Sequence, residues 1–191
     1  MIYIIRHGQT ELNKKNLLQG RSDEPLNAEG CLQAEQLKSF FEADGITFTQ
    51  VFTSPLIRAV QTAKIASGKE DMKADERLLE MDYGPYEGTD LKAIPPELLH
   101  FFMDFVNNPA PEGMERLDNV VKRSGDFLED IREAAKQGNI LVSTHAVAMK
   151  GLLEYLTPGS NGSYWSKTIG NCAVFAVEVS EEGFSIPKEI Y

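Results

Sequence analysis

Five polar side chains in this sequence stand at or just after the ends of apolar, β-branched runs. The runs cover residues 2–5, 51–53 and 140–144. Continuous runs of this kind are typical of strands buried on both faces of a parallel sheet. Ligands of such sheets bind beyond the carboxyl ends of the strands. The side chains that these ends would bring together are Arg6, His7, Ser54, Arg58 and His145.

The residues after the first run favour an anion as the ligand. Gly8 would let the backbone approach a bound group closely, and Gln9, Thr10 and Asn13 are short hydrogen-bonding residues at a predicted helix start. The chain has three histidines, and two of them occupy strand ends. The pattern therefore predicts a small anion pocket at this edge of the sheet.

Four sequence blocks together resemble the histidine phosphatase superfamily, the phosphoglycerate mutase-like proteins. The first block is Arg6-His7-Gly8-Gln9-Thr10, followed by Asn13 and Gln19-Gly20-Arg21. The others are residues 54–63, residues 80–88 and Val142-Ser143-Thr144-His145, in the order of the family. The Arg-His-Gly tripeptide alone is a weak signal, and the ordered set is a specific one.

The resemblance implies a phosphoryl-transfer enzyme in which His7 attacks phosphorus and carries the phosphoryl group. Neighbouring cations would keep His7 neutral, and arginine forks match phosphate oxygens. Glu80 would be the general acid, with Asp82 and Glu87 as nearby alternatives. The expected catalytic set is His7, Glu80, Arg6, Arg58 and His145. The expected substrate-binding set is Arg6, Gly8, Asn13, Gln19, Gly20, Arg58 and His145. No metal and no cofactor are expected.

The alternation of strand and helix patterns predicts an α/β fold. The resemblance adds three layers: a mostly parallel central sheet with helices on both faces, phosphoglycerate mutase-like. Helices are expected from Asn27 to about residue 41, from a Ser54-Pro55 start through Ile65, over 115–135 and over 146–155, with an antiparallel pair near Gly183 closing the sheet. Residues 1–191 would form one domain. The proline-rich and aromatic stretch of about 81–114 would be an inserted cap.

Composition narrows the partners. The net charge of −10 repels polyanions, which argues against nucleic acid and favours a small phosphorylated substrate held locally. No window reaches the length needed to cross a membrane, and two cysteines are too few for a disulfide framework. We therefore expect a cytoplasmic protein. The sequence makes no prediction of its oligomeric state.

Between hydrolysis and mutase transfer, the sequence favours hydrolysis. Residues 81–114 contain one Lys or Arg residue, Lys92. A single lysine provides too little positive charge to bind a second phosphate group tightly. The expected function is a metal-independent phosphomonoesterase. The alternatives are a phosphoglycerate mutase and a catalytically idle relative that binds a phosphorylated ligand. Arg116 stands where the family has a serine, and it would recognise a further anion if it points inward or be ordinary helix surface if it points outward.

Overall fold

The computed structural model describes residues 1–191, and its centre is a six-stranded sheet. The strand order is β3-β2-β4-β1-β5-β8. The first four strands of this order are parallel to one another. Strand β5 is antiparallel to β1, and β8 is antiparallel to β5. A separate hairpin joins β6 and β7. The strands are β1 (Ile2–Arg6), β2 (Gln50–Thr53), β3 (Lys73–Ala74), β4 (Ile140–Thr144), β5 (Val174–Val177), β6 (Val179–Ser180), β7 (Gly183–Phe184) and β8 (Lys188–Glu189).

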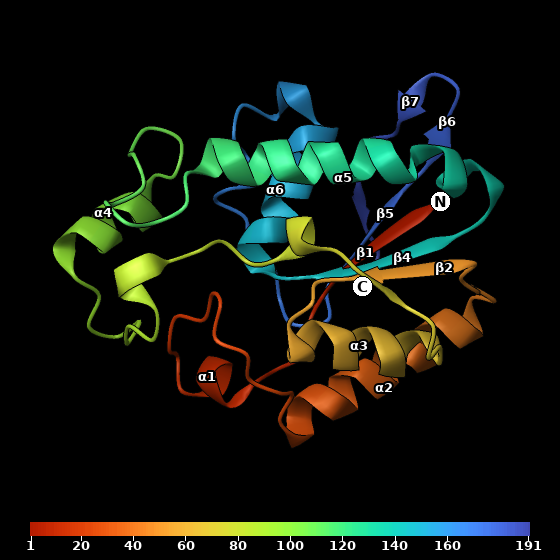
Figure 1. Cartoon of the computed structure of the whole chain (residues 1–191), viewed down its shortest axis with the longest axis horizontal. Coiled ribbons are helices and arrows are strands. Elements are labelled where there is room, and N and C mark those ends of the chain that lie inside the picture. The colour runs from red at the N-terminus through yellow and green to blue at the C-terminus, as the bar shows by residue number, and fades with distance from the viewer.

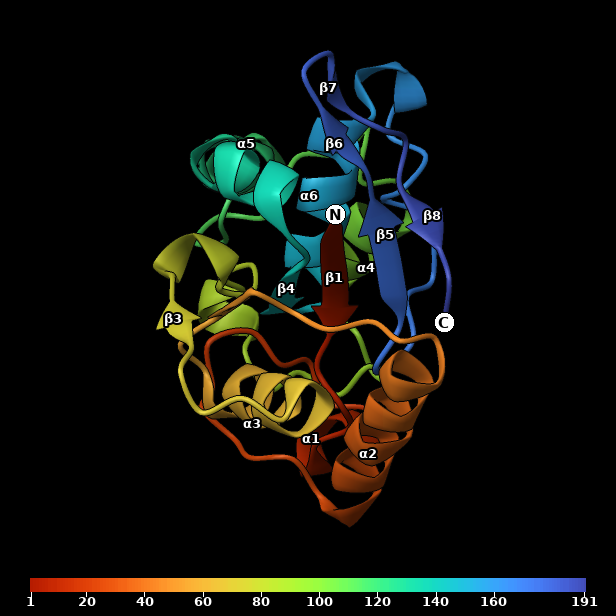
Figure 2. The same ribbon diagram turned by 90° about the vertical axis from the view of Figure 1, so that its right-hand side faces the viewer.

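Helices cover both faces of this sheet, as Figures 1 and 2 show. Helices α5 (Leu117–Gln137) and α6 (Ala146–Leu156) lie on one face, and α2 (Ala28–Ala43) and α3 (Ile57–Ser67) lie on the other. Alternate residues of β1 serve the two layers, because successive side chains of a strand point to opposite faces. Ile4 packs in the cluster of α5 and α6, and Ile5 packs in the cluster of α2 and α3. The expected three-layer α/β fold is confirmed.

The register of the parallel strands decides which residues meet at their carboxyl ends. In the pairing of β1 with β4, Arg6 lies opposite Thr144, so His7 and His145 follow directly from paired residues. In the pairing of β2 with β4, Thr53 lies opposite Ser143, and the N–H of Ser54 donates to the carbonyl of Ser143 over 2.9 Å. The three apolar runs therefore deliver their polar ends to one place, as the sequence predicted.

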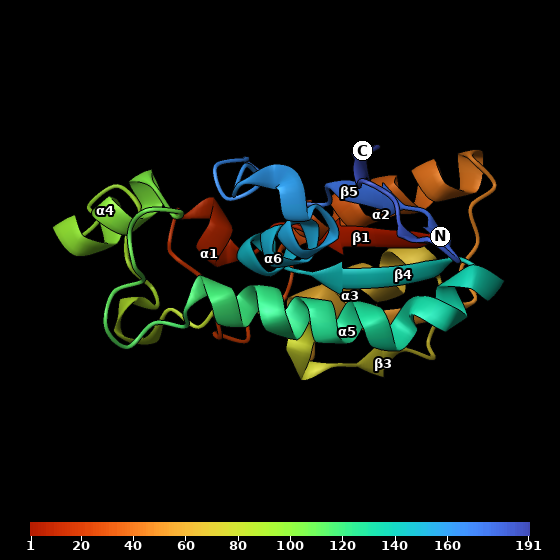
Figure 3. The ribbon, with the colours of Figure 1, turned by 90° about the horizontal axis from the view of Figure 1, so that it is seen from above.

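Residues 81–114 lie beyond that end of the sheet. This segment contains the 3-10 turn η2 (Gly84–Tyr86) and helix α4 (Pro96–Met103), which Figures 1 and 3 show at the far end of the molecule from the N-terminus. It has an apolar cluster of its own, which also takes in Val147 of α6 and Trp165. The segment is thus fixed against the edge where the polar residues gather.

Two helix starts illustrate how local the sequence signals are. Asn27 caps α2 as expected, since its side chain accepts from the N–H of Gly30 over 2.9 Å. The expected start at Ser54-Pro55 is wrong, because α3 begins at Ile57 and Asp23 accepts its N–H over 2.6 Å. The expected antiparallel pair that closes the sheet is present as β5 and β8, whereas the turn at Gly183 belongs to the separate hairpin of β6 and β7.

The remaining short elements connect these layers, and none of the helices combines the length and apolar character needed to cross a bilayer. The connecting elements are α1 (Glu11–Lys14), η1 (Glu76–Leu78) and η3 (Pro158–Ser160).

Candidate active site

His7 lies at the centre of the polar cluster and is 3% exposed. Its ring centroid is 5.1 Å from that of His145. The Nδ1 atom lies 2.7 Å from the carbonyl oxygen of Gly8. A carbonyl can only accept, so Nδ1 carries the proton and Nε2 keeps a free electron pair. The arrangement presents a neutral imidazole with one defined nucleophilic atom.

Burial and two neighbouring cations keep this ring uncharged. Burial lowers the pKa of His7 well below its ordinary value, and the positive charges of Arg6 and Arg58 lower it further, against a smaller raising effect of the Gly8 hydrogen bond. Burial, followed by the positive charge of Arg58, likewise lowers the pKa of His145 well below its ordinary value. The expectation that flanking cations hold His7 neutral is confirmed in direction.

Arg58 is fully buried and organises the loop of residues 20–22. Its two terminal nitrogens donate to the carbonyls of Ser22 and Gly20 over 2.6 and 2.7 Å. Its Nε–H donates to Nδ1 of His145 over 3.2 Å. Three of the five N–H bonds of the guanidinium are thereby used, and the others stay available to an anion. Burial lowers the pKa of Arg58 to about 10, so the group stays charged at neutral pH.

Arg6 has more of its donors free than Arg58. One terminal nitrogen donates to the carbonyl of Ile169, and the buried Nε–H has no partner. A buried donor without a partner costs free energy, so an anion that accepts from this Nε–H is bound favourably. Arg6 lies close enough to His7 for its positive charge to lower the pKa of that ring, so the free Nε–H belongs to the same site.

Glu80 is 3% exposed and binds the first turn of α6. Its carboxylate accepts from the N–H of Ala148 over 2.9 Å and from that of Val147 over 3.1 Å. It also accepts from its neighbour Met81 over 2.9 Å. Since α6 starts directly after His145, these bonds hold Glu80 at the helix start that follows His145, and the charge of Glu80 acts on Arg6 and Arg58.

The two alternative acids have other positions. The carboxylate of Glu87 accepts the backbone N–H groups of Gly20, Arg21 and Ser22 and the hydroxyl of Ser22. Asp82 is exposed and accepts from the N–H of Gly84. Of the three acidic residues, Glu80 is the one that binds the helix start directly after His145.

Gly20 has both backbone groups engaged by neighbours. Its N–H donates to Glu87 and its carbonyl accepts from Arg58. A Cβ at this position would lie 2.7 Å from Glu87 and from the ring of Tyr83. Gly8 is comparable: its N–H donates to Thr62, and a Cβ would lie 2.5 Å from the carbonyl oxygen of Gly30. Gly8 and Gly20 belong to the expected substrate-binding set, and in the structure both allow protein segments to pack closely.

Gln19, like Arg6, has a buried donor without a partner. Its Oε1 accepts from the hydroxyl of Thr10 over 2.7 Å and from Nδ2 of Asn13 over 3.3 Å. Those two bonds fix the amide orientation, and the buried Nε2 is left without a partner. Asn13 itself closes the capping box of α1 with Thr10. Asn13 therefore holds Gln19, and Gln19 presents the free N–H bonds.

Sequence reasoning missed Asn171 and did not single out Tyr83. Asn171 precedes β5, and its Nδ2 donates to the backbone carbonyl of His7 over 2.9 Å. Tyr83 is 4% exposed, and burial followed by the charge of Glu80 raises the pKa of its phenol well above the ordinary value. The phenol thus remains a donor near Glu80. Tyr83 lies within the third block, whereas no local pattern marks Asn171.

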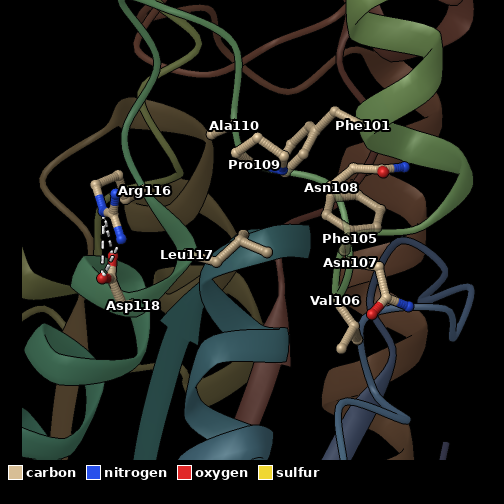
Figure 4. Close-up of a pocket in the computed structure, with 10 residues that line it drawn as sticks. All are labelled: Phe101, Phe105, Val106, Asn107, Asn108, Pro109, Ala110, Arg116, Leu117 and Asp118. Atoms are coloured by element: carbon tan, nitrogen blue, oxygen red, sulfur yellow. Dashed lines mark hydrogen bonds and ion pairs between the residues drawn. The ribbon is translucent and has the colours of Figure 1, made fainter.

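Arg116 points outward, at the edge of a hollow of about 360 Å³ in the 81–114 region (Figure 4). Its side chain is 74% exposed and pairs with Asp118 at 2.8 Å, the pair drawn with dashed lines in the figure. This settles the sequence alternative in favour of helix surface. The apolar lining of the hollow includes Phe101, Phe105 and Leu117. No group of three or more His, Cys, Asp or Glu side chains is placed to hold a metal ion.

The chain is similar to known proteins over nearly its whole length. The model of the histidine phosphatase superfamily, branch 1, matches residues 2–189. A Hydrogenobacter thermophilus protein named "Putative phosphoserine phosphatase 2" is 28% identical over 95% of this chain and 90% of its own length.

Solved structures share the fold over the whole chain. A mutant phosphoserine phosphatase from Entamoeba histolytica, in complex with phosphoserine, has a TM-score of 0.83 at 22% identity and covers 100% of this chain and 94% of its own. A phosphoglycerate mutase from Thermus thermophilus has a TM-score of 0.75 at 25% identity and covers 100% of this chain and 99% of its own. The fold is therefore phosphoglycerate mutase-like, as the sequence resemblance implied.

Proposed function

The chain belongs to branch 1 of the histidine phosphatase superfamily, and from this premise we propose that it is a metal-independent phosphomonoesterase acting on a small phosphorylated metabolite through a phosphohistidine at His7. A phosphatase is what the family and the phosphatase-named relative support. The observation that carries the proposal is the free Nε2 of His7, fixed by the Nδ1 bond to Gly8 and lying in the field of Arg6 and Arg58.

In the first step, Nε2 of His7 forms a bond to phosphorus while the bond from phosphorus to the ester oxygen breaks. Charge spreads over the three other phosphoryl oxygens, and the free N–H bonds of Arg6 and Arg58 offset it. The carboxyl of Glu80 gives its proton to the departing alkoxide, which leaves as the alcohol. Gln19 donates an N–H to a phosphoryl oxygen, and Asn13 holds Gln19 in that orientation.

In the second step, water attacks the phosphohistidine. Glu80 takes the proton from the water, the bond between nitrogen and phosphorus breaks, and His7 returns to its neutral form. His145 has both ring nitrogens engaged, with Nδ1 accepting from Arg58 and Nε2 lying 2.8 Å from the hydroxyl of Ser54. A phosphoryl oxygen can replace Ser54 as the acceptor for Nε2–H of His145. Gly8 and Gly20 support the phosphate-binding side chains because they let neighbouring protein segments pack closely.

We take residues 81–114 as the cap that covers the leaving-group side of a one-domain protein. The aromatic residues of this segment suit a small organic leaving group, and phosphoserine, the substrate in the relative's name, belongs in the first panel of compounds. Two unpaired cysteines fit a cytoplasmic location. The −10 charge disfavours nucleic acid as a partner.

Mutase activity is the second candidate, favoured by the shared fold with a phosphoglycerate mutase. It uses the same phosphohistidine and differs in passing the phosphoryl group to another hydroxyl. Against it stands the single base, Lys92, of the 81–114 segment, which is exposed. An idle ligand-binding relative would not need both a nucleophile and an acid.

The test is the release of inorganic phosphate from an aryl phosphate in the presence of EDTA. Wild type, His7→Ala and His100→Ala are compared, because His100 is an exposed histidine of α4 and serves as the matched control. Release by wild type and His100→Ala, with none by His7→Ala, supports the proposal. Full activity of His7→Ala, or a loss of activity with EDTA, contradicts it.

A further inference from the structure

Glu80 lies in a stretch of irregular backbone. Residues 79–83 separate η1 from η2, and no helix or strand includes them. The N–H groups at the start of α6 bind the carboxylate of Glu80 and leave its backbone free. A general acid must lie within hydrogen-bond reach of the oxygen that it protonates. Contacts from other parts of the chain must therefore fix the backbone that carries Glu80.

Arg123 of α5 binds the backbone directly before Glu80. One of its terminal nitrogens donates to the carbonyls of Arg77 and Leu79, each over 2.6 Å. Leu79 is the residue that precedes Glu80. Hydrogen bonds from a charged donor are stronger than those between neutral groups. Helix α5 thereby holds the chain on the N-terminal side of the acid.

The other edge of the same guanidinium binds Glu115, which holds the chain on the C-terminal side. The Nε and the second terminal nitrogen of Arg123 donate to the two carboxylate oxygens of Glu115 over 2.8 and 3.1 Å. Glu115 in turn accepts the N–H of Asp82 over 3.2 Å and donates its own N–H to the carbonyl of Asp82 over 2.8 Å. The side chains of the ion pair are 15% and 13% exposed. One partly buried pair thus holds the backbone on both sides of Glu80.

The same backbone is also bound to the strand that leads to His145. The hydroxyl of Thr144, the last residue of β4, donates to the carbonyl of Leu78 over 2.8 Å. Thr144 is fully buried and precedes His145. The bonds from Arg123 and Thr144 therefore fix the acid-bearing segment relative to the histidines.

We propose that Arg123 is a positioning residue for proton transfer. Through the carbonyls of Arg77 and Leu79 and through Glu115, it holds Glu80 where its carboxyl reaches the oxygen of the leaving group. The inference rests on the proposed function for the role of Glu80 as the acid. It goes further by naming a residue of α5 that acts on the reaction through Glu80.

The leaving group separates this role from a purely structural one. An ion pair that only stabilises the fold changes the fraction of folded molecules, which changes the rate for every substrate by the same factor. A displaced acid harms only those substrates whose leaving oxygen needs a proton. An alkyl phosphate needs that proton, whereas an aryl phosphate loses a phenolate readily.

The experiment compares kcat/KM for an alkyl and an aryl phosphate in wild type, Arg123→Met and Arg132→Met. This quantity reports the step in which the leaving group departs and is independent of the later hydrolysis of the phosphohistidine. Arg123→Met should lower it at least about tenfold more for the alkyl phosphate, since misplacement by about 1 Å can cost about 100-fold. Arg132→Met is the matched control and should keep the wild-type ratio, because Arg132 of α5 pairs with Glu129 and binds the carbonyl of Glu181 instead.

A double variant tests whether the effect passes through Glu80. When Glu80→Gln is already present, adding Arg123→Met should change the ratio of the two rates by less than about twofold, because no acid remains to be positioned. A shift as large as in the wild-type background overturns the inference. An equal loss for both substrates in the single Arg123→Met variant also overturns it.

Glu115→Gln provides a second route if Arg123→Met does not fold. It keeps an acceptor for Arg123 and removes the charge, and it should shift the ratio in the same direction by at least about threefold. An unchanged ratio in Glu115→Gln overturns the inference in that case.

The Glu80→Gln variant separates this inference from the proposed function. If Glu80→Gln shows no dependence on the leaving group, the acid role of Glu80 is wrong and the inference falls with it. If Glu80→Gln shows that dependence and Arg123→Met does not, the inference alone is overturned.

Discussion

The Nε–H of Arg58 donates to Nδ1 of His145 over 3.2 Å, within a pair that is completely buried. Because Nδ1 accepts this bond, the ring proton of His145 lies on Nε2, which faces the hydroxyl of Ser54. A single guanidinium therefore sets the tautomer of one histidine, lowers the pKa of the other and holds the carbonyls of Gly20 and Ser22.

Arg58→Ala should lower stability and activity together. The substitution leaves two backbone carbonyls and a ring nitrogen without their donor, and each buried group without a partner costs about 1–3 kcal/mol. We expect the free energy of unfolding in urea to fall by several kcal/mol. Arg58→Lys restores the charge without the forked geometry and should recover little activity. A stable, fully active Arg58→Ala protein would contradict this account of the bonds that Arg58 donates.

Glu80→Gln should affect substrates according to their leaving group. An alkoxide leaves poorly without a proton, whereas a phenolate leaves readily, so kcat/KM should fall much more for an alkyl phosphate than for an aryl phosphate. Glu87→Gln disturbs the loop of residues 20–22 and should reduce both rates by similar factors. Asp82→Asn, at an exposed position, should leave both nearly unchanged. An equal loss for the two substrates in Glu80→Gln would remove Glu80 from the acid role.

Stability should decrease as the pH falls below the ordinary histidine pKa of 6.5. His7 and His145 have lowered pKa values in the folded state and stay neutral there, while the unfolded chain takes up protons at both. Each group then costs about 1.4 kcal/mol per pH unit below that value. We expect the free energy of unfolding to drop between about pH 6.5 and pH 5.5, above the carboxylate range.

The matched variants identify the groups responsible for this pH dependence. His7→Ala should reduce the slope of stability against pH to roughly half, since one of the two groups is removed. His100→Ala is measured alongside as the control at an exposed histidine outside the polar cluster. An unchanged slope in His7→Ala would mean that His7 does not lose its charge on folding.

Arg116→Ala should leave catalysis unchanged. The side chain points to solvent and pairs only with Asp118 at the surface, and exposed pairs of this kind contribute about 0–1 kcal/mol. Steady-state kinetics on the aryl phosphate and on phosphoserine should give wild-type values within about twofold. A large increase of KM for phosphoserine would show that Arg116 turns inward when the substrate binds.

The sheet and most of the polar cluster could be predicted from the sequence, because both depend on local signals. Three apolar runs end in polar residues, and the parallel register of β1, β2 and β4 brings those ends together. A residue whose position depends on distant contacts could not be predicted: Asn171 reaches the carbonyl of His7 from a loop 164 residues away.

The predicted start of α3 was wrong for a similar reason, because the true start depends on contacts with residues distant in sequence. Ser54 has the chemistry of a cap, but its hydroxyl lies against Nε2 of His145, and Asp23 from a separate loop accepts the N–H of Ile57 instead. The contacts of Gly20 could not be predicted either, because Glu87 and Arg58, which bind its N–H and its carbonyl, are both distant in sequence.

The most direct test of the central claim is to trap the phosphoryl group on the protein. Wild type is mixed rapidly with an aryl phosphate, quenched in alkali, which preserves phosphohistidine, and digested for mass spectrometry. The account predicts one phosphoryl group on His7 in the wild type and none in His7→Ala. Phosphate release without any phosphoryl group on His7, or a phosphoryl group on another residue, would contradict it.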